Sequence, residues 1–186
     1  MEKVRCGWAE HASELDKKYH DEEWGVPVYD DCVLFEFLIL EGMQAGLSWT
    51  TILHRRETMR EAFDNYNLQK IMNYDQKKKD ALLQNPGIIR NRLKVDALVI
   101  NARLFSDIQK EYGSFSNYLW AFVDGKPIVN KRKTMKDVPV STILSDQISK
   151  DLKKRGFKFV GTTIMYAYLQ AVGVVNDHEE RCFCCN

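Results

Sequence analysis

The sequence has few of the features that mark disordered, membrane-spanning or secreted proteins. It contains four prolines and ten glycines in 186 residues, too few for a collagen-like or a long disordered segment. No apolar run approaches the roughly 18 residues that a membrane-spanning helix needs, and the first residues lack the apolar stretch of a secretory signal. We therefore expect one globular domain, residues 1–186, that acts in the cytoplasm without a membrane partner.

Cysteine is also sparse, and its number is odd. The five cysteines are spread between positions 6 and 185, which does not match the even disulfide framework of a small secreted domain. Disulfide bonds are therefore not expected.

Net charge is almost absent, but the charges are segregated along the chain. The 27 Lys and Arg residues against 26 Asp and Glu residues give a net charge of +1. Residues 1–41 hold 11 acidic and four basic residues, whereas residues 126–158 hold ten basic and three acidic ones. The basic region is either an ordinary solvated surface or a patch that binds nucleic acid, and composition does not decide between them.

Helical patterns dominate the sequence. The clearest apolar stripe repeats every three or four positions and comprises Ile89, Leu93, Ala97, Ile100, Leu104 and Ile108,. An apolar run over 32–40 follows two aspartates that are good N-cap candidates, which predicts a helix buried on nearly all sides,. Further helices are expected over about 48–64, 75–84, 115–123, 145–155 and 162–172, with no β-hairpin. The fold class is therefore predicted to be all-α.

A basic helix, a turn between Gly156 and Gly161, and a second helix follow one another near the C-terminus. Glycine lets a backbone approach a phosphate closely, and the free N–H groups that begin a helix attract anions. The segment is thus a candidate phosphate-binding site. The alternative is an ordinary pair of helices in which the glycine only ends the first helix.

Two pairs of metal-ligand residues lie at opposite ends of the chain. His178 and Cys182 are four positions apart and would share one face of a helix, which suits half of a tetrahedral zinc site,. Cys6 and His20 are candidates for the other half. One zinc would then tie together segments that are 172 positions apart,. In the alternative, these residues bind no metal and the C-terminal cysteines are reactive or buried.

A carboxylate and four aromatic residues are the remaining candidates for chemistry. Glu41 closes the apolar run, so its carboxyl is expected to be partly removed from water and to need a hydrogen-bond partner,. Trp8, Tyr19, Trp24 and Trp49 all lie in the first 49 residues. They form either part of the core or a stacking platform for a ligand.

Six segments in order along the chain resemble the DNA-3-methyladenine glycosylase I family. They are Arg5–Trp8, Tyr19–Pro27, Leu40–Trp49, Gly87–Arg92, Lys154–Thr163 and Val175–His178. The resemblance implies a monomeric helix-hairpin-helix DNA glycosylase. Such an enzyme takes 3-methyladenine out of alkylated double-stranded DNA, releases the free base and leaves an abasic site.

The resemblance also implies a structural zinc ion, one per chain, held by four matched residues. These ligands are Cys6, His20, His178 and Cys182. Because four protein ligands leave no open position for water, such a zinc would join the N- and C-terminal segments and take no part in hydrolysis.

The matched segments imply roles in binding the base. Trp49 would stack on the flipped base, Tyr19 would meet its edge, and Glu41 would accept a hydrogen bond from its exocyclic amine. N3-methylation leaves the purine cationic, so aromatic faces and a buried carboxylate would favour it over neutral adenine. Because the base is already a good leaving group, no strong protein acid is expected to be needed.

The same resemblance places DNA contacts at Gly46 and Leu47, which we call the wedge, and at Gly161, Thr162 and Thr163 of the hairpin. Leu47 would fill the gap left by the flipped nucleotide. Thr162 and Thr163 stand where bifunctional relatives carry a lysine nucleophile, so no Schiff base and no lyase step are expected. Two other classes remain open on the residues alone: a zinc-stabilised nucleic-acid-binding module without catalysis, and a small-molecule enzyme with its pocket around Glu41.

Overall fold

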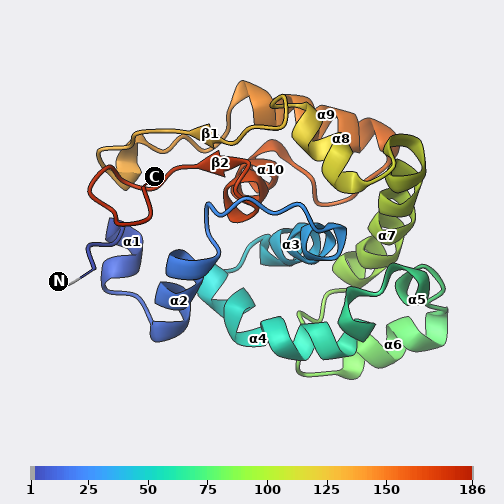
Figure 1. Cartoon of the computed structure of the whole chain (residues 1–186). Coiled ribbons are helices and arrows are strands. Elements are labelled where there is room, and N and C mark those ends of the chain that lie inside the picture. Colours follow the sequence, from blue (N-terminus) through green and yellow to red (C-terminus); the bar gives the residue numbers. More distant parts are fainter. Residues whose placement is uncertain (1–2, 186) are drawn as a thin grey trace.

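The computed structural model describes residues 3–185, and helices make up most of them (Figure 1). The α-helices are α1 (Gly7–Glu10), α2 (Glu14–Glu22), α3 (Asp31–Gln44), α4 (Trp49–Ala62), α5 (Leu68–Met72), α6 (Gln76–Gln84), α7 (Arg92–Tyr112), α8 (Phe115–Ala121), α9 (Ile143–Arg155) and α10 (Thr162–Ala171). Two 3₁₀ turns span Asp64–Tyr66 and Met135–Asp137, and two short strands are β1 (Ile128–Val129) and β2 (Val175–Asn176). The predicted helical fold class is confirmed.

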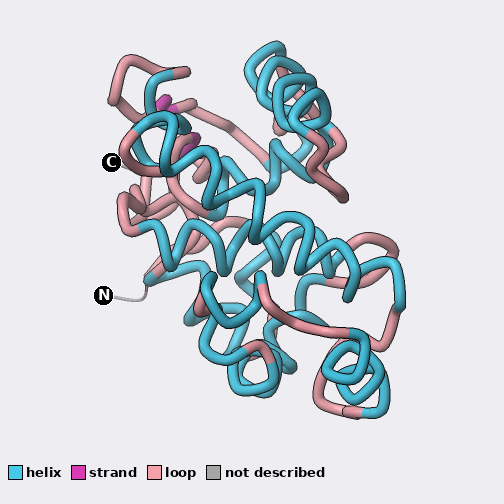
Figure 2. Tube along the Cα trace, turned by 90° about the vertical axis from the view of Figure 1, so that its right-hand side faces the viewer, coloured by secondary structure: helices cyan, strands magenta, loops and turns pink. Residues whose placement is uncertain are grey.

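The strands add only a small parallel pair to this helical fold. Ile128 of β1 faces Val175 of β2 in register, and the two strands lie close together away from most of the helices (Figure 2). Among residues 3–185 no helix has the length and apolar character to cross a membrane.

Side-chain caps fix where the predicted helices begin. The Asp30 carboxylate accepts a hydrogen bond from the Val33 amide at the start of α3, and the Ser48 hydroxyl accepts one from the Thr51 amide at the start of α4. Such caps satisfy amides that have no partner inside the helix. Every residue from 34 to 43 is buried, which confirms that α3 is surrounded on nearly all sides.

The predicted stripe on α7 is only partly right. The helix exists, but it begins at Arg92, after Ile89, and the Leu93 side chain is 70 % exposed. The buried side chains of α7 include Val95, Leu98, Val99, Ala102 and Phe105. The helix packs against α3, α5, α6 and α8, so its buried surface is broader than one stripe and lies away from Leu93. Helices α1 and α5 were missed because they are too short to show a period, and α2 because it is largely polar.

The central helices bring the two ends of the chain together. Helix α3 packs against α4, α7, α8 and α10, and α10 packs against α9. Figure 1 shows the N-terminal segment and α1 beside the C-terminal loop, where the Phe183 amide donates a hydrogen bond to the Val4 carbonyl at 3.0 Å. The buried apolar side chains of the described residues form one core cluster.

The turn after α10 yields a stability prediction. Gly173 has φ +67°, and a Cβ there would overlap the backbone of Val26 and Pro27. Gly173→Ala should lower the free energy of unfolding by roughly 3 kcal/mol or more, because both the conformation and the space oppose a side chain. Gly125 is the matched control, since it has φ +73° but nothing within 4 Å of an added Cβ. Gly125→Ala should cost only about 1 kcal/mol, and equal losses in urea unfolding would contradict the steric argument.

Candidate active site and metal cluster

A pocket of about 240 Å³ lies between the N-terminal helices, α3, α4 and α10. It is lined by Trp8, Tyr19, Trp24, Glu41, Gln44, Trp49, Met135, Ala167 and Gln170. The three residues assigned to base recognition, Tyr19, Glu41 and Trp49, are therefore brought together. The tryptophans at 8 and 24 also line the pocket, so the aromatic residues of the N-terminal segment serve both the core and a cavity wall.

Glu41 is the only acidic residue in the pocket lining. The buried helix α3 carries it, and its side chain is 4 % exposed. Among residues 3–185 its carboxyl forms no hydrogen bond or ion pair, and burial is the one cause of its pKa shift. Burial alone raises the Glu41 pKa to about 8, because a desolvated carboxylate is costly. The expected hydrogen-bond partner is therefore absent from the described protein residues, which leaves the carboxyl available to a ligand.

Aromatic rings surround this carboxyl. The Tyr19 and Trp49 ring centroids are 5.2 Å apart, and those of Trp8 and Trp24 are 5.4 Å apart in an edge-to-face arrangement. Burial and then the charge of Glu41 raise the Tyr19 pKa, so its hydroxyl keeps its proton. The Trp49 indole N–H is buried without a partner in the described chain. The pocket thus offers ring faces together with polar atoms that remain unpaired.

Gln170 and Met135 line the pocket but were not anticipated. The Gln170 amide nitrogen donates to Asp177 at 2.8 Å, and Asp177 is fully buried. Asp177 also accepts hydrogen bonds from the side chains of Asn130, Arg132 and Tyr166, which lower its pKa against the effect of burial. No motif marks a residue 94 positions downstream of Glu41, as Met135 is, so the sequence gives no signal for it.

A second hollow, of about 340 Å³, adjoins the pocket. Glu41, Gln44 and Ala167 line both, and the second also includes Ala45, Gly46, Leu47, Thr163 and Ile164. The Leu47 side chain is 42 % exposed. The proposed wedge and the start of α10 therefore border one groove, and that groove leads to the Glu41 carboxyl.

The hairpin between α9 and α10 has the expected local geometry. Gly156 ends α9 in the left-handed conformation with φ +101°, and the Phe157 amide donates back to the Leu152 carbonyl at 3.0 Å, as in a Schellman motif. Gly161 precedes α10, and an added Cβ there would have nothing within 4 Å. The first glycine thus ends a helix, while the second leaves the backbone at the start of α10 open to solvent.

Basic residues and hydroxyls border the hairpin. Lys150, Lys153 and Thr162 line a shallow depression together with Asp146 and Ser149. The Thr162 hydroxyl donates to Asp146 at 2.6 Å, so that hydroxyl is already engaged, whereas Thr163 lines the neighbouring groove. The predicted contact residues Thr162 and Thr163 therefore line different hollows, and the Thr162 hydroxyl is already hydrogen-bonded.

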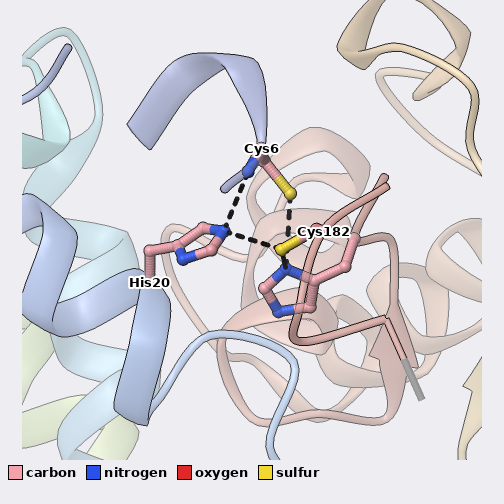
Figure 3. Close-up of side chains that lie close together, drawn as sticks. Cys6, His20 and Cys182 are labelled. Carbon is pink, nitrogen blue, oxygen red and sulfur yellow. Dashed lines mark hydrogen bonds between the residues drawn. The ribbon is translucent and has the colours of Figure 1, made fainter. Parts of the chain in front are cut away.

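The four predicted metal ligands form one buried cluster. The ligand atoms of Cys6, His20, His178 and Cys182 all lie within 4.8 Å of one another. Figure 3 shows Cys6, His20 and Cys182 pointing toward a common centre from segments far apart in the sequence. The Cys184 sulfur is not among the clustered ligand atoms and lies 4.0 and 3.9 Å from the carbonyl oxygens of His20 and Asp21. Cys184 and Cys185 are the other candidate ligands in this segment; the four-residue spacing from His178 favours Cys182, and Cys182 is the one whose sulfur lies in the cluster.

Neighbouring groups orient the two histidines so that one nitrogen of each faces the sulfurs, although His20 Nε2 also accepts a hydrogen bond from the Cys6 amide at 3.3 Å. His20 Nδ1 lies 2.9 Å from the Asp21 carboxylate, and His178 Nε2 lies 2.9 Å from the Trp24 carbonyl. Each of these nitrogens can donate a proton to its partner, so the other nitrogen is left as an acceptor that faces the sulfurs. Arg5 holds the Asp21 carboxylate through two hydrogen bonds of 2.8 Å, which fixes this arrangement from outside.

The sulfur atoms fit a metal as well. The Glu179 amide donates to Cys6 Sγ at 3.3 Å, and the Cys184 amide donates to Cys182 Sγ at 3.4 Å. Burial raises the Cys6 pKa, so a thiolate there needs a nearby cation. Two thiols and two imidazoles with supporting hydrogen bonds are a donor set that can hold a metal ion.

The fold and site together define a helical enzyme with an aromatic pocket close to a turn between two helices. The chain belongs to the methyladenine glycosylase family, whose family model matches residues 8–185. It is 46 % identical over 180 residues to DNA-3-methyladenine glycosylase 1 of Escherichia coli strain K12, covering 97 % of this chain and 96 % of that protein. It is also 46 % identical over 182 residues to DNA-3-methyladenine glycosylase of Haemophilus influenzae, covering 97 % of both.

Solved structures show the same similarity. A crystal structure of 3-methyladenine DNA glycosylase I matches with a TM-score of 0.95 and 46 % identity, covering 98 % of this chain and all of that one. A structure of the Staphylococcus aureus 3-methyladenine DNA glycosylase I, concerned with recognition of 3-methyladenine, matches with a TM-score of 0.94 and 36 % identity over 98 % and 96 % of the two chains.

The buried carboxyl of Glu41 predicts a specific pH dependence of stability. Its pKa is raised from 4.5 to about 8 in the folded protein, so between these values the unfolded chain loses the proton first. The free energy of unfolding should therefore fall as pH rises from about 5 to about 8, by up to about 1.4 kcal/mol per pH unit from this group.

Glu41→Gln isolates that contribution. The variant should be about as stable as the wild type near pH 5 and more stable by a few kcal/mol near pH 8, because glutamine needs no proton to stay neutral. Chemical denaturation at several pH values measures the difference in the free energy of unfolding between the two proteins. The contributions of the other titrating groups cancel in this difference. Parallel curves across this range would show that Glu41 titrates normally.

Proposed function

We propose that this protein is a monofunctional DNA glycosylase that hydrolyses the N-glycosidic bond of 3-methyladenine in alkylated double-stranded DNA and leaves an abasic site. The observation that carries the proposal is the unpaired Glu41 carboxyl inside an aromatic pocket of about 240 Å³. Family membership and the activity named for the relatives support it. A flipped base is flat, has π-faces, and enters such a pocket from the DNA side.

Selectivity follows from the charge of the lesion. A 3-methyladenine nucleotide is cationic, and a cation beside Glu41 favours the ionised carboxylate, whereas neutral adenine does not. Trp49 provides a ring face for stacking and cation–π attraction, and Tyr19 bounds the edge of the base. Glu41 accepts the hydrogen bond of the exocyclic amine. The empty acceptor positions of the carboxyl support this assignment.

The groove beside the pocket suits the duplex. The exposed side chain of Leu47, carried by the turn at Gly46, fills the space left in the base stack,. Gly161, Thr162 and Thr163 at the start of α10 meet the phosphate backbone through free amides, and the lysines of α9 add positive charge. In this arrangement the backbone contacts orient the DNA while the pocket reads the base.

Bond cleavage draws on the same interactions. The leaving base becomes neutral as the bond breaks and the sugar carries the developing positive charge, so a base that is bound as a cation departs without a strong protein acid. No lysine stands at 162 or 163, which supports hydrolysis without a Schiff base and hence without strand cleavage. The hairpin and the pocket together suit a helix-hairpin-helix glycosylase that acts as a monomer.

We also assign the Cys6, His20, His178 and Cys182 cluster to one structural zinc ion. Two thiolates and two imidazoles match the ligand types and number of a closed zinc site. Zinc there supplies a cross-link between the ends of the chain and no reactive water.

A base-release experiment tests the function. Incubation with methylated duplex DNA should release free 3-methyladenine, detected by chromatography, without cutting the strand. Glu41→Gln should lower the single-turnover rate by about a hundredfold, because it removes the charge that favours the cation. The matched control is Glu61→Gln, an exposed glutamate on α4, which should behave as the wild type.

Absence of released base from a folded wild type would refute the enzyme. Strong salt-dependent DNA binding without release would instead favour the non-catalytic nucleic-acid-binding module. No retention on DNA at low salt would favour a small-molecule enzyme.

Elemental analysis tests the metal. The purified protein should contain one zinc ion per chain, and Cys182→Ser should lose it and melt at least roughly 5 °C lower. Cys184→Ser is the matched control and should keep both the metal and the melting temperature, because the Cys184 sulfur is not one of the four clustered ligand atoms and its backbone amide still donates to Cys182 Sγ. Full zinc content in Cys182→Ser would show that a neighbouring cysteine serves as the ligand.

A further inference from the structure

Helix α7 carries two buried polar side chains that the proposed chemistry does not use. Lys94 is 7 % exposed and Asn101 is 4 % exposed. They are seven positions apart, which is about two helical turns, so both lie on the same face of α7. Burying polar groups is costly unless they form hydrogen bonds, so their partners indicate what each one holds.

Lys94 holds the end of α3. Its ammonium donates to the Met43 carbonyl at 2.8 Å and to the Ala45 carbonyl at 2.7 Å. No carboxylate forms an ion pair with it among residues 3–185, and burial lowers its pKa. Free carbonyls at the C-terminal end of a helix attract a cation, and these two lie directly before the wedge, Gly46 and Leu47.

Asn101 holds the hairpin in the same way. Its amide nitrogen donates to the Lys158 carbonyl at 2.9 Å, and its amide oxygen accepts from the Lys158 amide at 2.9 Å. One side chain thus satisfies both backbone groups of a residue in the turn between α9 and α10. This pairing fixes the turn in position and orientation.

The two held segments also contact each other. A Cβ added at Gly42 of α3 would lie 3.3 Å from the Phe159 Cβ in the hairpin turn, so the two backbones run close together. Beyond this contact, Leu47 and Thr163 line the same groove. The spacing between wedge and hairpin is therefore set by α7 on one side and by close packing on the other.

We propose that Lys94 and Asn101 are positioning residues that fix the distance between the wedge and the hairpin, so that a duplex held at the hairpin is bent over Leu47 and its damaged nucleotide reaches the pocket. This inference rests on the proposed function. Small misplacements of groups that orient a substrate lower rates strongly, so loss of either contact impairs excision from duplex DNA and spares the pocket itself.

Substitutions on α7 separate duplex handling from base binding. Lys94→Met keeps the apolar stem without the ammonium, and Asn101→Leu keeps the volume without the amide. Each should lower single-turnover release of 3-methyladenine from methylated duplex DNA at least tenfold. The affinity for free 3-methyladenine, measured by tryptophan fluorescence, should stay within twofold. Asp96→Asn, which breaks only the ion pair of α7 with Lys79, is the matched control and should change neither quantity.

Two results would overturn the inference. One is an unchanged rate in folded Lys94→Met and Asn101→Leu. The other is an equal loss of duplex release and of free-base affinity, which would indicate a general role in folding. Should either variant fail to fold, Lys94→Arg or Asn101→Asp takes its place. The inference then stands if the loss in the rate of release from duplex DNA exceeds the loss in affinity for free 3-methyladenine. Release by the wild type is measured first. No release by the wild type would contradict the proposed function, whereas normal release by both the wild type and the variants would contradict only this inference.

Discussion

Desolvation of the Glu41 carboxyl is the constraint on which the site depends. Helix α3 is buried on nearly all sides and carries this group into a pocket of aromatic rings, where burial raises its pKa to about 8. The protein supplies no ion-pair or hydrogen-bond partner for it within residues 3–185. An acid in such surroundings gains most from a partner that brings positive charge, so the cost of burial becomes a preference for a cationic base over a neutral one.

The walls of this pocket are attached to the Cys/His cluster. Trp8 lies two residues after Cys6, and Tyr19 directly precedes His20. The Trp24 carbonyl accepts the hydrogen bond of His178, and their rings are 4.6 Å apart. Anything that stabilises the cluster therefore also holds the aromatic walls. A metal remote from the reacting atoms can in this way affect base recognition through the position of the rings.

The sequence predicted most of the long helices and the residues that the family resemblance marked. Periodicity and caps located α3, α4 and α6, because these signals are local. Periodicity wrongly placed Leu93 on the buried face, since it records which residues are apolar and not which faces other helices cover. Glu41 lies in one pocket with Tyr19 and Trp49, the residues that the resemblance grouped with it. Met135 and Gln170 depend on how distant segments fold over this pocket, and no local pattern carries that information.

Two residues to which we assign functions are costly ones for the fold. A neutralised Glu41 and a buried Lys94 without a carboxylate each lower stability relative to an ordinary choice at that position,. Lys94 differs from Glu41 because its ammonium contacts backbone carbonyls and cannot meet a ligand from its buried position. A buried ammonium there is explained by what it orients, and what it orients is the turn that carries Leu47. Stability is thus lowered both at a group that is proposed to bind the base and at a group that is proposed to position the turn.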